Sequence, residues 1–190
     1  MGTVAIVDYG VGNLKSVANA LSYLGCSSCI TADPAELERA DAIILPGVGA
    51  FPDAADRLRS GGLDQHVLAQ GQKKPVLGIC LGMQLLLEQG REVRPCPGLG
   101  VIRGTVDRIP TQSKLPHIGW NSLRFFHHSP LFRGLDEGAY VYFVHSFSAQ
   151  DTDPAQVIAV TDYGPAVTAA VSSGNFYGTQ FHPEKSGEVG

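Results

Sequence analysis

The sequence has 190 residues, of which 44% are hydrophobic and 17% charged, a composition typical of a globular domain. Its formal net charge of −4 and its lack of a Lys/Arg-rich run argue against a nucleic-acid partner. No apolar stretch approaches the ~18 residues of a membrane span. The N-terminus also lacks the basic segment and long apolar segment of a signal peptide. We therefore expect a cytoplasmic protein with no membrane partner.

The first half of the chain alternates short apolar strands with helices. Strands are expected at residues 3–8, 29–31, 41–45 and 75–80, and helices at 13–24, from 33 onward, at 52–70 and at 82–89. Asp33-Pro34 is a favoured helix start, Pro46-Gly47 ends a strand, and Gly61-Gly62 interrupts a helix. Such alternation is typical of a doubly wound, mainly parallel sheet flanked by helices.

The pattern changes after about residue 98. Short, β-rich, turn-bounded runs follow at residues 101–109, 118–125, 140–147, 156–161, 166–172 and 176–181. We interpret them as antiparallel strands added to the same domain, because no linker, repeat or low-complexity segment separates them from the first half. The predicted fold is therefore α/β, in a single domain over residues 1–190.

A candidate nucleophile lies where the strand at 75–80 meets the following helix. Gly78 and Gly82 flank Cys80 at two residues on each side, and their small size lets strand and helix approach closely. Such a turn is strained and lifts the sulfur to a helix N-terminus, where the dipole favours the thiolate. The Leu81 backbone N–H is free in that first turn and is able to face an oxyanion. The alternative is a buried structural cysteine between packing glycines.

A candidate base lies near the C-terminus, in the run Phe181-His182-Pro183-Glu184. Residues two apart in an extended segment point to one side, so His182 and Glu184 share a face. A nucleophilic cysteine needs a base, and the base needs an acid that holds its tautomer and stabilises the imidazolium. A histidine beside a glutamate is usually a surface pair, but together with Cys80 the combination is far more specific.

Two glycine-rich turns carry weaker signals. Pro46-Gly47-Val48-Gly49 is able to offer backbone N–H groups to an anion, although a plain strand-to-helix turn is the commoner structure. Gly10-Val11-Gly12-Asn13 opens a helix but lacks the third glycine of a dinucleotide-binding motif. We therefore expect no cofactor at the second turn.

Cysteine and histidine spacings do not indicate a metal site. Cys26 and Cys29 have CxxC spacing, but they begin a strand and no second cysteine pair is present, so we interpret them as half-buried thiols. With Cys80 and Cys96, they are too few for a disulfide scaffold and fit a reducing compartment. No metal-ligand spacing joins the remaining histidines to cysteines or acids, and His66 is expected on an exposed helix face; the others are His117, His127, His128 and His145.

The segment 78–84 together with His182-Pro183-Glu184 resembles the class I, or triad, glutamine amidotransferases. Further segments are similar to the glutaminase-subunit family of imidazole glycerol phosphate synthase, from histidine biosynthesis; they span residues 8–13, 46–49, 116–121, 142–146 and 178–186. The similarity runs through almost the whole chain. The triad motif marks the superfamily, whereas the segments 116–121 and 142–146 mark this subunit.

The resemblance implies a role for each matching residue. Cys80 is the nucleophile, His182 the base and Glu184 its orienter, while the backbone amides of Val48 and Leu81 face the oxyanion. Glutamine is held by a set that includes backbone groups: Gly47, Gly49, Gln84, Glu92, Ser146 and Phe147. The resemblance also implies a partner, a (β/α)₈-barrel cyclase that forms a heterodimer with this chain. The cyclase receives the ammonia and makes imidazole glycerol phosphate and an aminoimidazole carboxamide ribonucleotide. The face toward this cyclase carries Asn13, Trp120, Tyr142 and Lys185.

The sequence departs from this family at its end. Members continue past Pro183–Ser186 into a closing helix, whereas this sequence stops at Gly190, so we expect that helix to be absent and Glu184 and Lys185 to be held less firmly. Two alternatives stay open. One is the glutaminase subunit of another synthase, serving pyridoxal phosphate or aminobenzoate synthesis; the other is a non-catalytic docking relative, which would be marked by loss of Cys80, His182 or Glu184.

Overall fold

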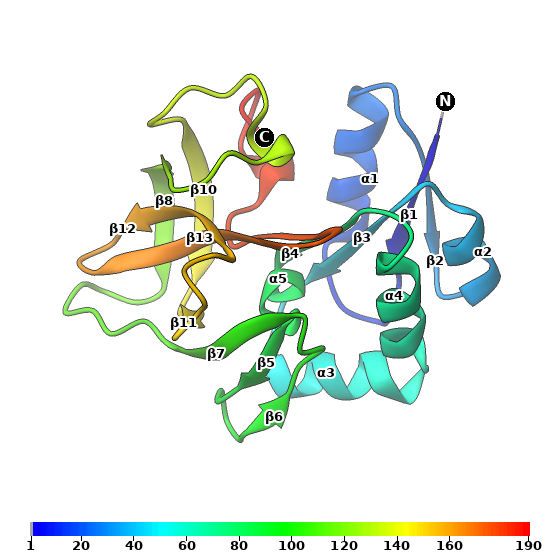
Figure 1. The fold of residues 1–190 in the computed structure, drawn as a ribbon, viewed down its shortest axis with the longest axis horizontal. Coiled ribbons are helices and arrows are strands. Elements are labelled where there is room, and N and C mark those ends of the chain that lie inside the picture. Colours follow the sequence, from blue (N-terminus) through cyan, green and yellow to red (C-terminus); the bar gives the residue numbers. More distant parts are fainter. Residues whose placement is uncertain (1) are drawn as a thin grey trace.

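An eight-stranded sheet organises the computed structural model, which describes residues 2–190 (Figure 1). Its strand order is β2-β1-β3-β4-β14-β13-β12-β9, and among the described residues a two-stranded sheet, β10-β8, and a four-stranded sheet, β11-β7-β5-β6, accompany it. The strands of the first half are β1 Thr3–Val7, β2 Ser27–Thr31, β3 Ala42–Gly47, β4 Val76–Cys80, β5 Leu87–Gly90 and β6 Cys96–Pro97. Those of the second half are β7 Ile102–Arg108, β8 His117–Ser122, β9 Arg124–Phe125, β10 Tyr140–His145, β11 Phe147–Gln150, β12 Val157–Asp162, β13 Ala166–Ser173 and β14 Phe176–Thr179.

Helices cover both faces of the parallel half of this sheet. They are α1 Leu14–Tyr23, α2 Pro34–Arg39, α3 Phe51–Ser60, α4 Leu63–Gly71 and α5 Leu81–Leu85, with 3₁₀ turns η1 Pro130–Phe132 and η2 Pro183–Lys185. Because side chains alternate along a strand, Ala5 and Val7 of β1 join the core under α2, α3 and α4, whereas Ile6 packs with α1. The doubly wound, mainly parallel arrangement expected from the sequence is thereby confirmed.

The antiparallel half also agrees with expectation, with one correction. Strands β13, β12 and β9 extend the same sheet by antiparallel pairing and enclose a second core around Phe143, Ile158 and Phe181. Strand β14 was expected among the antiparallel additions and does pair antiparallel with β13, but its other edge pairs in parallel with β4, in the register Gly178–Gly78. This pairing joins the two halves and carries the segment after β14 to the end of β4, where Cys80 lies.

Several element boundaries differ from those expected. The single strands expected at 118–125 and 140–147 are each two strands in different sheets, β8 with β9 and β10 with β11. The helix expected at 82–89 is only α5 Leu81–Leu85, because the residues after Leu86 form β5 and pair with β7. Strand β3 does not end before Pro46 but continues through Gly47 beside β4. Since β1 pairs with β3 only as far as Ile44, β3 borders β4 alone at Pro46 and tolerates the missing N–H there. Within residues 2–190, none of the helices is long and apolar enough to cross a membrane.

Candidate active site

Cys80 lies in a strained turn between β4 and α5. Its backbone angles are φ 55° and ψ −109°, a positive-φ conformation that residues with a side chain rarely adopt. The residue is 8% exposed and lines a cavity of about 360 Å³. The strained turn expected from the sequence is present, although α5, with five residues, offers a weaker dipole than the longer helix that was expected.

The glycines around Cys80 are required by close backbone contacts. A Cβ atom built on Gly82 would lie 1.8 Å from the carbonyl oxygen of Leu45, and one on Gly78 would lie 2.6 Å from the carbonyl oxygen of Gly82. Both distances are far below van der Waals contact, so β3, β4 and α5 approach one another this closely only because these residues lack side chains.

We expect Gly82→Ala to lower the free energy of unfolding by at least about 3 kcal/mol, since the rigid backbone of Leu45 is unable to move away from the new methyl group. Gly61→Ala is a matched control, because a Cβ there would meet nothing closer than 3.7 Å at a helical φ of −85°. Its free energy of unfolding should change by less than about 1 kcal/mol. Urea unfolding measures both values, and equal stability of the two variants would show that the contact at Gly82 is not tight.

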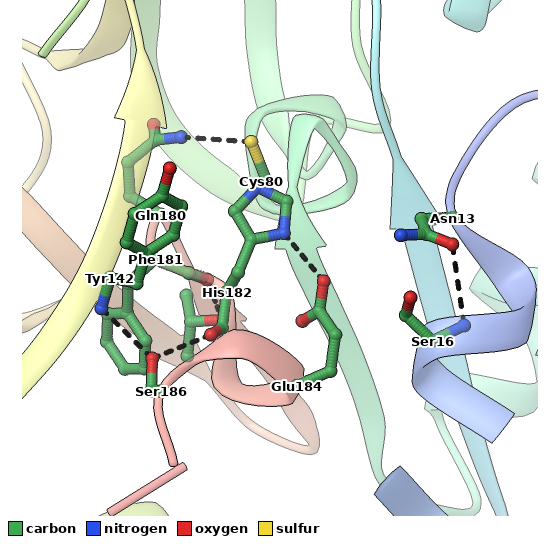
Figure 2. A network of polar contacts seen from close by, with 10 residues as sticks. Asn13, Ser16, Cys80, Tyr142, Gln180, Phe181, His182, Glu184 and Ser186 are labelled. Atoms are coloured by element: carbon green, nitrogen blue, oxygen red, sulfur yellow. Dashed lines mark hydrogen bonds and ion pairs between the residues drawn. The ribbon is translucent and has the colours of Figure 1, made fainter. Parts of the chain in front are cut away.

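His182 and Glu184 form a buried pair at η2, after β14, and His182 contacts Cys80. The Nδ1 atom of His182 lies 2.8 Å from Glu184 Oε1, and the two side chains are 3% and 4% exposed (Figure 2). Burial lowers the pKa of His182, but hydrogen bonds to Cys80 and Glu184 and the charges of both outweigh burial and raise it to about 9. His182 therefore holds a proton at neutral pH, the form that pairs with a thiolate.

The cavity beside Cys80 collects most of the residues that the sequence assigned to substrate and oxyanion. Its lining includes Val48, Gly49, Leu81, Gln84, Glu92, Ser146, Phe147, His182 and Lys185. It also includes three residues that were not assigned, namely Pro116, Val144 and His145. Gly47 does not line the cavity; it pairs with Cys80 across β3 and β4 and packs against the Tyr9 hydroxyl, where a Cβ would lie only 2.8 Å away.

Two of the lining side chains are already committed to the fold. The Nε2 atom of Gln84 donates to the Phe147 carbonyl at 2.9 Å and to Gln180 Oε1 at 3.0 Å, which leaves its Oε1 for a bound molecule. Glu92 Oε2 accepts from the backbone N–H of Phe51 at 2.9 Å and so fixes the start of α3. The other carboxylate oxygen of Glu92 is the one available to the cavity.

The four residues assigned to a partner face do not lie in one group. Trp120 and Tyr142 are register neighbours on β8 and β10 with ring centroids 6.0 Å apart, and Lys185 Nζ lies 6.0 Å from the Tyr142 ring. Asn13 lies apart from them, at the start of α1, where its side chain accepts from the Ser16 backbone N–H (Figure 2).

Sequence analysis missed a buried histidine pair beside the cavity. His145 Nδ1 donates to the Phe147 carbonyl at 2.8 Å, and its Nε2 lies 3.1 Å from Nδ1 of His117, which stacks on Tyr163. Burial lowers the pKa of His145 to about 4, against the hydrogen bond to Phe147, so His145 is neutral with its proton on Nδ1. Nε2 of His117 faces Asn121 Oδ1 at 2.8 Å. Their spacing in the sequence, 28 residues, gave no signal for this contact.

Two further polar residues near Cys80 and His182 were also missed. Ser186 Oγ donates to the His182 carbonyl at 2.7 Å and accepts from the Tyr142 backbone N–H at 3.0 Å, so it ties His182 to β10 (Figure 2). Gln180 Nε2 lies 3.7 Å from Cys80 Sγ. No cluster of three or more His, Cys, Asp or Glu side chains suited to a metal ion occurs in the described part of the chain, residues 2–190.

Comparison with known proteins identifies relatives over nearly the whole chain. Residues 5–190 match the family described as glutamine amidotransferase class-I. The imidazole glycerol phosphate synthase subunit HisH of Bacillus cereus is 48% identical over 190 residues, covering 98% of this chain and 90% of its own. The HisH subunit of Oceanobacillus iheyensis is also 48% identical, over 98% of this chain and 94% of its own.

Solved structures share the fold at lower identity. A crystal structure described as a glutamine amidotransferase superposes with a TM-score of 0.76 at 22% identity, covering 96% of this chain and 91% of its own. The PurLQS structure from Thermotoga maritima gives a TM-score of 0.74 at 21% identity, over 100% of this chain and 92% of that one. These similarities support the fold alone.

Proposed function

Since the chain belongs to the class I glutamine amidotransferases and, within them, to the HisH subunits of imidazole glycerol phosphate synthase, we propose that it hydrolyses the side-chain amide of glutamine and passes the ammonia to a cyclase partner. The observation that carries the proposal is that Cys80, in a strained turn, and His182, paired with buried Glu184, line one cavity. The names of the relatives favour this synthase over the pyridoxal phosphate and aminobenzoate alternatives. Residues 1–190 act as a single amidotransferase domain.

The reaction uses Cys80, His182 and Glu184 in two half-reactions. The Cys80 thiolate attacks the side-chain carbonyl carbon of glutamine, and the carbonyl electrons move to the oxygen. When the oxyanion collapses, the C–N bond breaks and His182 gives its proton to the leaving nitrogen, which releases ammonia and leaves a γ-glutamyl thioester. His182 then takes a proton from water, the hydroxide attacks the thioester, and the C–S bond breaks to release glutamate and regenerate the thiolate.

Glu184 acts through His182. Its Oε1 accepts the hydrogen bond from the proton-bearing Nδ1 of His182, which leaves Nε2 to exchange protons with substrate and water. Its Oε2 is buried and finds no hydrogen-bond partner among residues 2–190, so the carboxylate is held mainly by His182. The resulting preference for a charged imidazole agrees with the raised pKa of His182.

The outer face of β8 and β10 is the proposed docking surface for the cyclase, a (β/α)₈ barrel. Large apolar side chains are exposed there: Ile118 is 57%, Trp120 52% and Tyr140 58% exposed. An exposed apolar group of this kind on a folded domain favours burial against another protein. The surface also borders the catalytic histidine, because the Tyr142 carbonyl accepts from the His182 backbone N–H at 3.0 Å.

Cys29 is half-buried as expected, whereas Cys26 is exposed and not half-buried. Both are free thiols, which supports a reducing cytoplasm as the compartment. The docking surface and Lys185 at the cavity lining support a passage for ammonia at this end of the molecule.

We expect the free subunit to be a poor glutaminase that partner docking activates. The oxyanion needs two donors, and loss of one costs roughly 10²–10³-fold in rate. The Leu81 amide is fixed in the first turn of α5, but the Val48 amide lies in a turn where Val48 is 44% exposed and Gly49 has φ +102°. A turn with that freedom has more than one peptide orientation, and docking is able to shift its population toward the donor-inward state.

The test compares ammonia release from glutamine by the isolated chain and by the same chain with its cyclase partner and the partner's ligand. The proposal predicts a rate at least about 10²-fold higher in the complex. Gly49→Ala disfavours the φ of +102°, so it should change the ratio of the two rates rather than scale both equally. Equal rates of ammonia release with and without the partner would show that docking does not activate the glutaminase.

A further inference from the structure

We propose that Gln180 is a further catalytic residue, whose side-chain N–H stabilises the Cys80 thiolate alongside the base His182. The inference rests on the proposed hydrolase function and deepens it. Gln180 is 0% exposed, and its Nε2 lies 3.7 Å from Cys80 Sγ, within hydrogen-bond reach of a sulfur atom (Figure 2). A thiolate accepts hydrogen bonds far better than a thiol does, so a donor aimed at Sγ favours the charged form.

The orientation of the Gln180 amide follows from its neighbours. The Phe147 carbonyl is only able to accept, so the atom of Gln84 that faces it at 2.9 Å must be Nε2. The second N–H of that atom points to Gln180 at 3.0 Å, and therefore meets Oε1 rather than Nε2. With Oε1 held by Gln84, the Nε2 of Gln180 has to face Cys80.

The two partners of the sulfur come from one strand end. Gln180 and His182 both lie in the short stretch between β14 and η2 and both contact Cys80, whereas Glu184 lies in η2 and contacts His182. The backbone N–H of Gln180 bonds to the Ala169 carbonyl at 2.8 Å, which fixes its Cα next to β13. His182 moves protons, whereas the amide of Gln180 has no proton to exchange and acts as a fixed donor during thiolate attack and again when the thioester releases Sγ.

The test uses two substitutions of Gln180. Gln180→Leu removes the donor, and Gln180→Glu keeps an oxygen for Gln84 while placing an acceptor against the sulfur. A hydrogen bond to a charged group is worth enough that Gln180→Leu should lower glutaminase kcat/KM in the complex by roughly 10–100-fold, with a larger loss for Gln180→Glu. Gln70→Leu, which changes another buried glutamine outside the cavity lining, is the matched control and should stay within about twofold of the parent protein.

A second readout separates a catalytic from a structural role. The pH profile of Cys80 alkylation by iodoacetamide should move to higher pH in Gln180→Leu, and ammonia-dependent synthesis by the partner should stay intact. In the ¹⁵N-labelled parent protein, which needs no substitution at Gln180, the side-chain amide resonance of Gln180 should shift when Cys80 is alkylated.

Unchanged profiles and an unmoved amide resonance would overturn the assignment of Gln180, even if Cys80 is the nucleophile. Failure of the parent protein to hydrolyse glutamine or to be alkylated at Cys80 would instead overturn the proposed function. The two failures are therefore distinguishable in one set of measurements.

Discussion

Cys80→Ala is expected to abolish glutamine-dependent synthesis, with a loss of roughly 10⁶-fold, the scale seen when a triad nucleophile is removed. Alanine keeps the Cβ of cysteine, so the strained backbone at φ 55° is left as it is and only the sulfur is lost. Without the sulfur no thioester forms, and the remaining donors are only able to assist direct attack by water. Glutamate release in the complex with the cyclase measures the loss.

Ammonia-dependent synthesis by the same complex is the control. It bypasses Cys80 and should be unchanged, because the docking surface on β8 and β10 is not touched. Cys26→Ala changes an exposed thiol outside the cavity lining and should leave both activities unchanged. A Cys80→Ala protein that releases glutamate at the parent rate would show that another group is the nucleophile.

His182→Ala and Glu184→Gln are expected to act as one unit with unequal losses. His182 moves the proton, so its removal should cost on the order of 10⁶-fold, whereas Glu184 orients His182 and its change should cost about 10⁴-fold. The double variant should lose little more than His182→Ala alone, because Glu184 has nothing to orient once His182 is gone. The glutaminase rates of the four proteins in the complex measure this directly.

If the activity lost in the double variant equals the product of the two single losses, His182 and Glu184 do not act as one unit. Glu184 would then contact substrate or water independently, through the Oε2 atom that has no partner within residues 2–190. A Glu184→Asp variant, which keeps the charge but shortens the reach to Nδ1, should recover part of the activity lost in Glu184→Gln.

Local patterns carried most of what sequence analysis predicted. The strand–glycine–cysteine–glycine–helix turn is set by short-range sterics and is therefore visible in the sequence. His182 and Glu184 do form a pair, but Glu184 lies in the 3₁₀ turn η2 and not in the extended segment that was expected. The helix start at Asp33-Pro34 was equally local, and Asp33 does cap α2. Gln180 was missed, because the direction of its amide depends on Gln84 and Phe147, far away along the chain.

Features that depend on long-range pairing were the ones missed. Helix α5 ends early because β5 pairs with β7, and nothing in the sequence of residues 82–89 indicates this pairing. The contact of His117 with His145 arises from the register of β8 and β10, which the sequence does not state. The parallel pairing of β14 with β4 was hidden because the strands that precede β14 in the second half pair mostly antiparallel.

The covalent step at Cys80 is the central claim, and trapping it is the most direct test. The complex is incubated with a chloroketone analogue of glutamine, which occupies the cavity and alkylates the group that attacks the side-chain carbonyl. Peptide mass spectrometry should find one label per chain, on Cys80 and on none of Cys26, Cys29 or Cys96, with glutamine protecting against it. Labelling of another residue at the rate of inactivation, or inactivation that leaves Cys80 unmodified, would contradict the account.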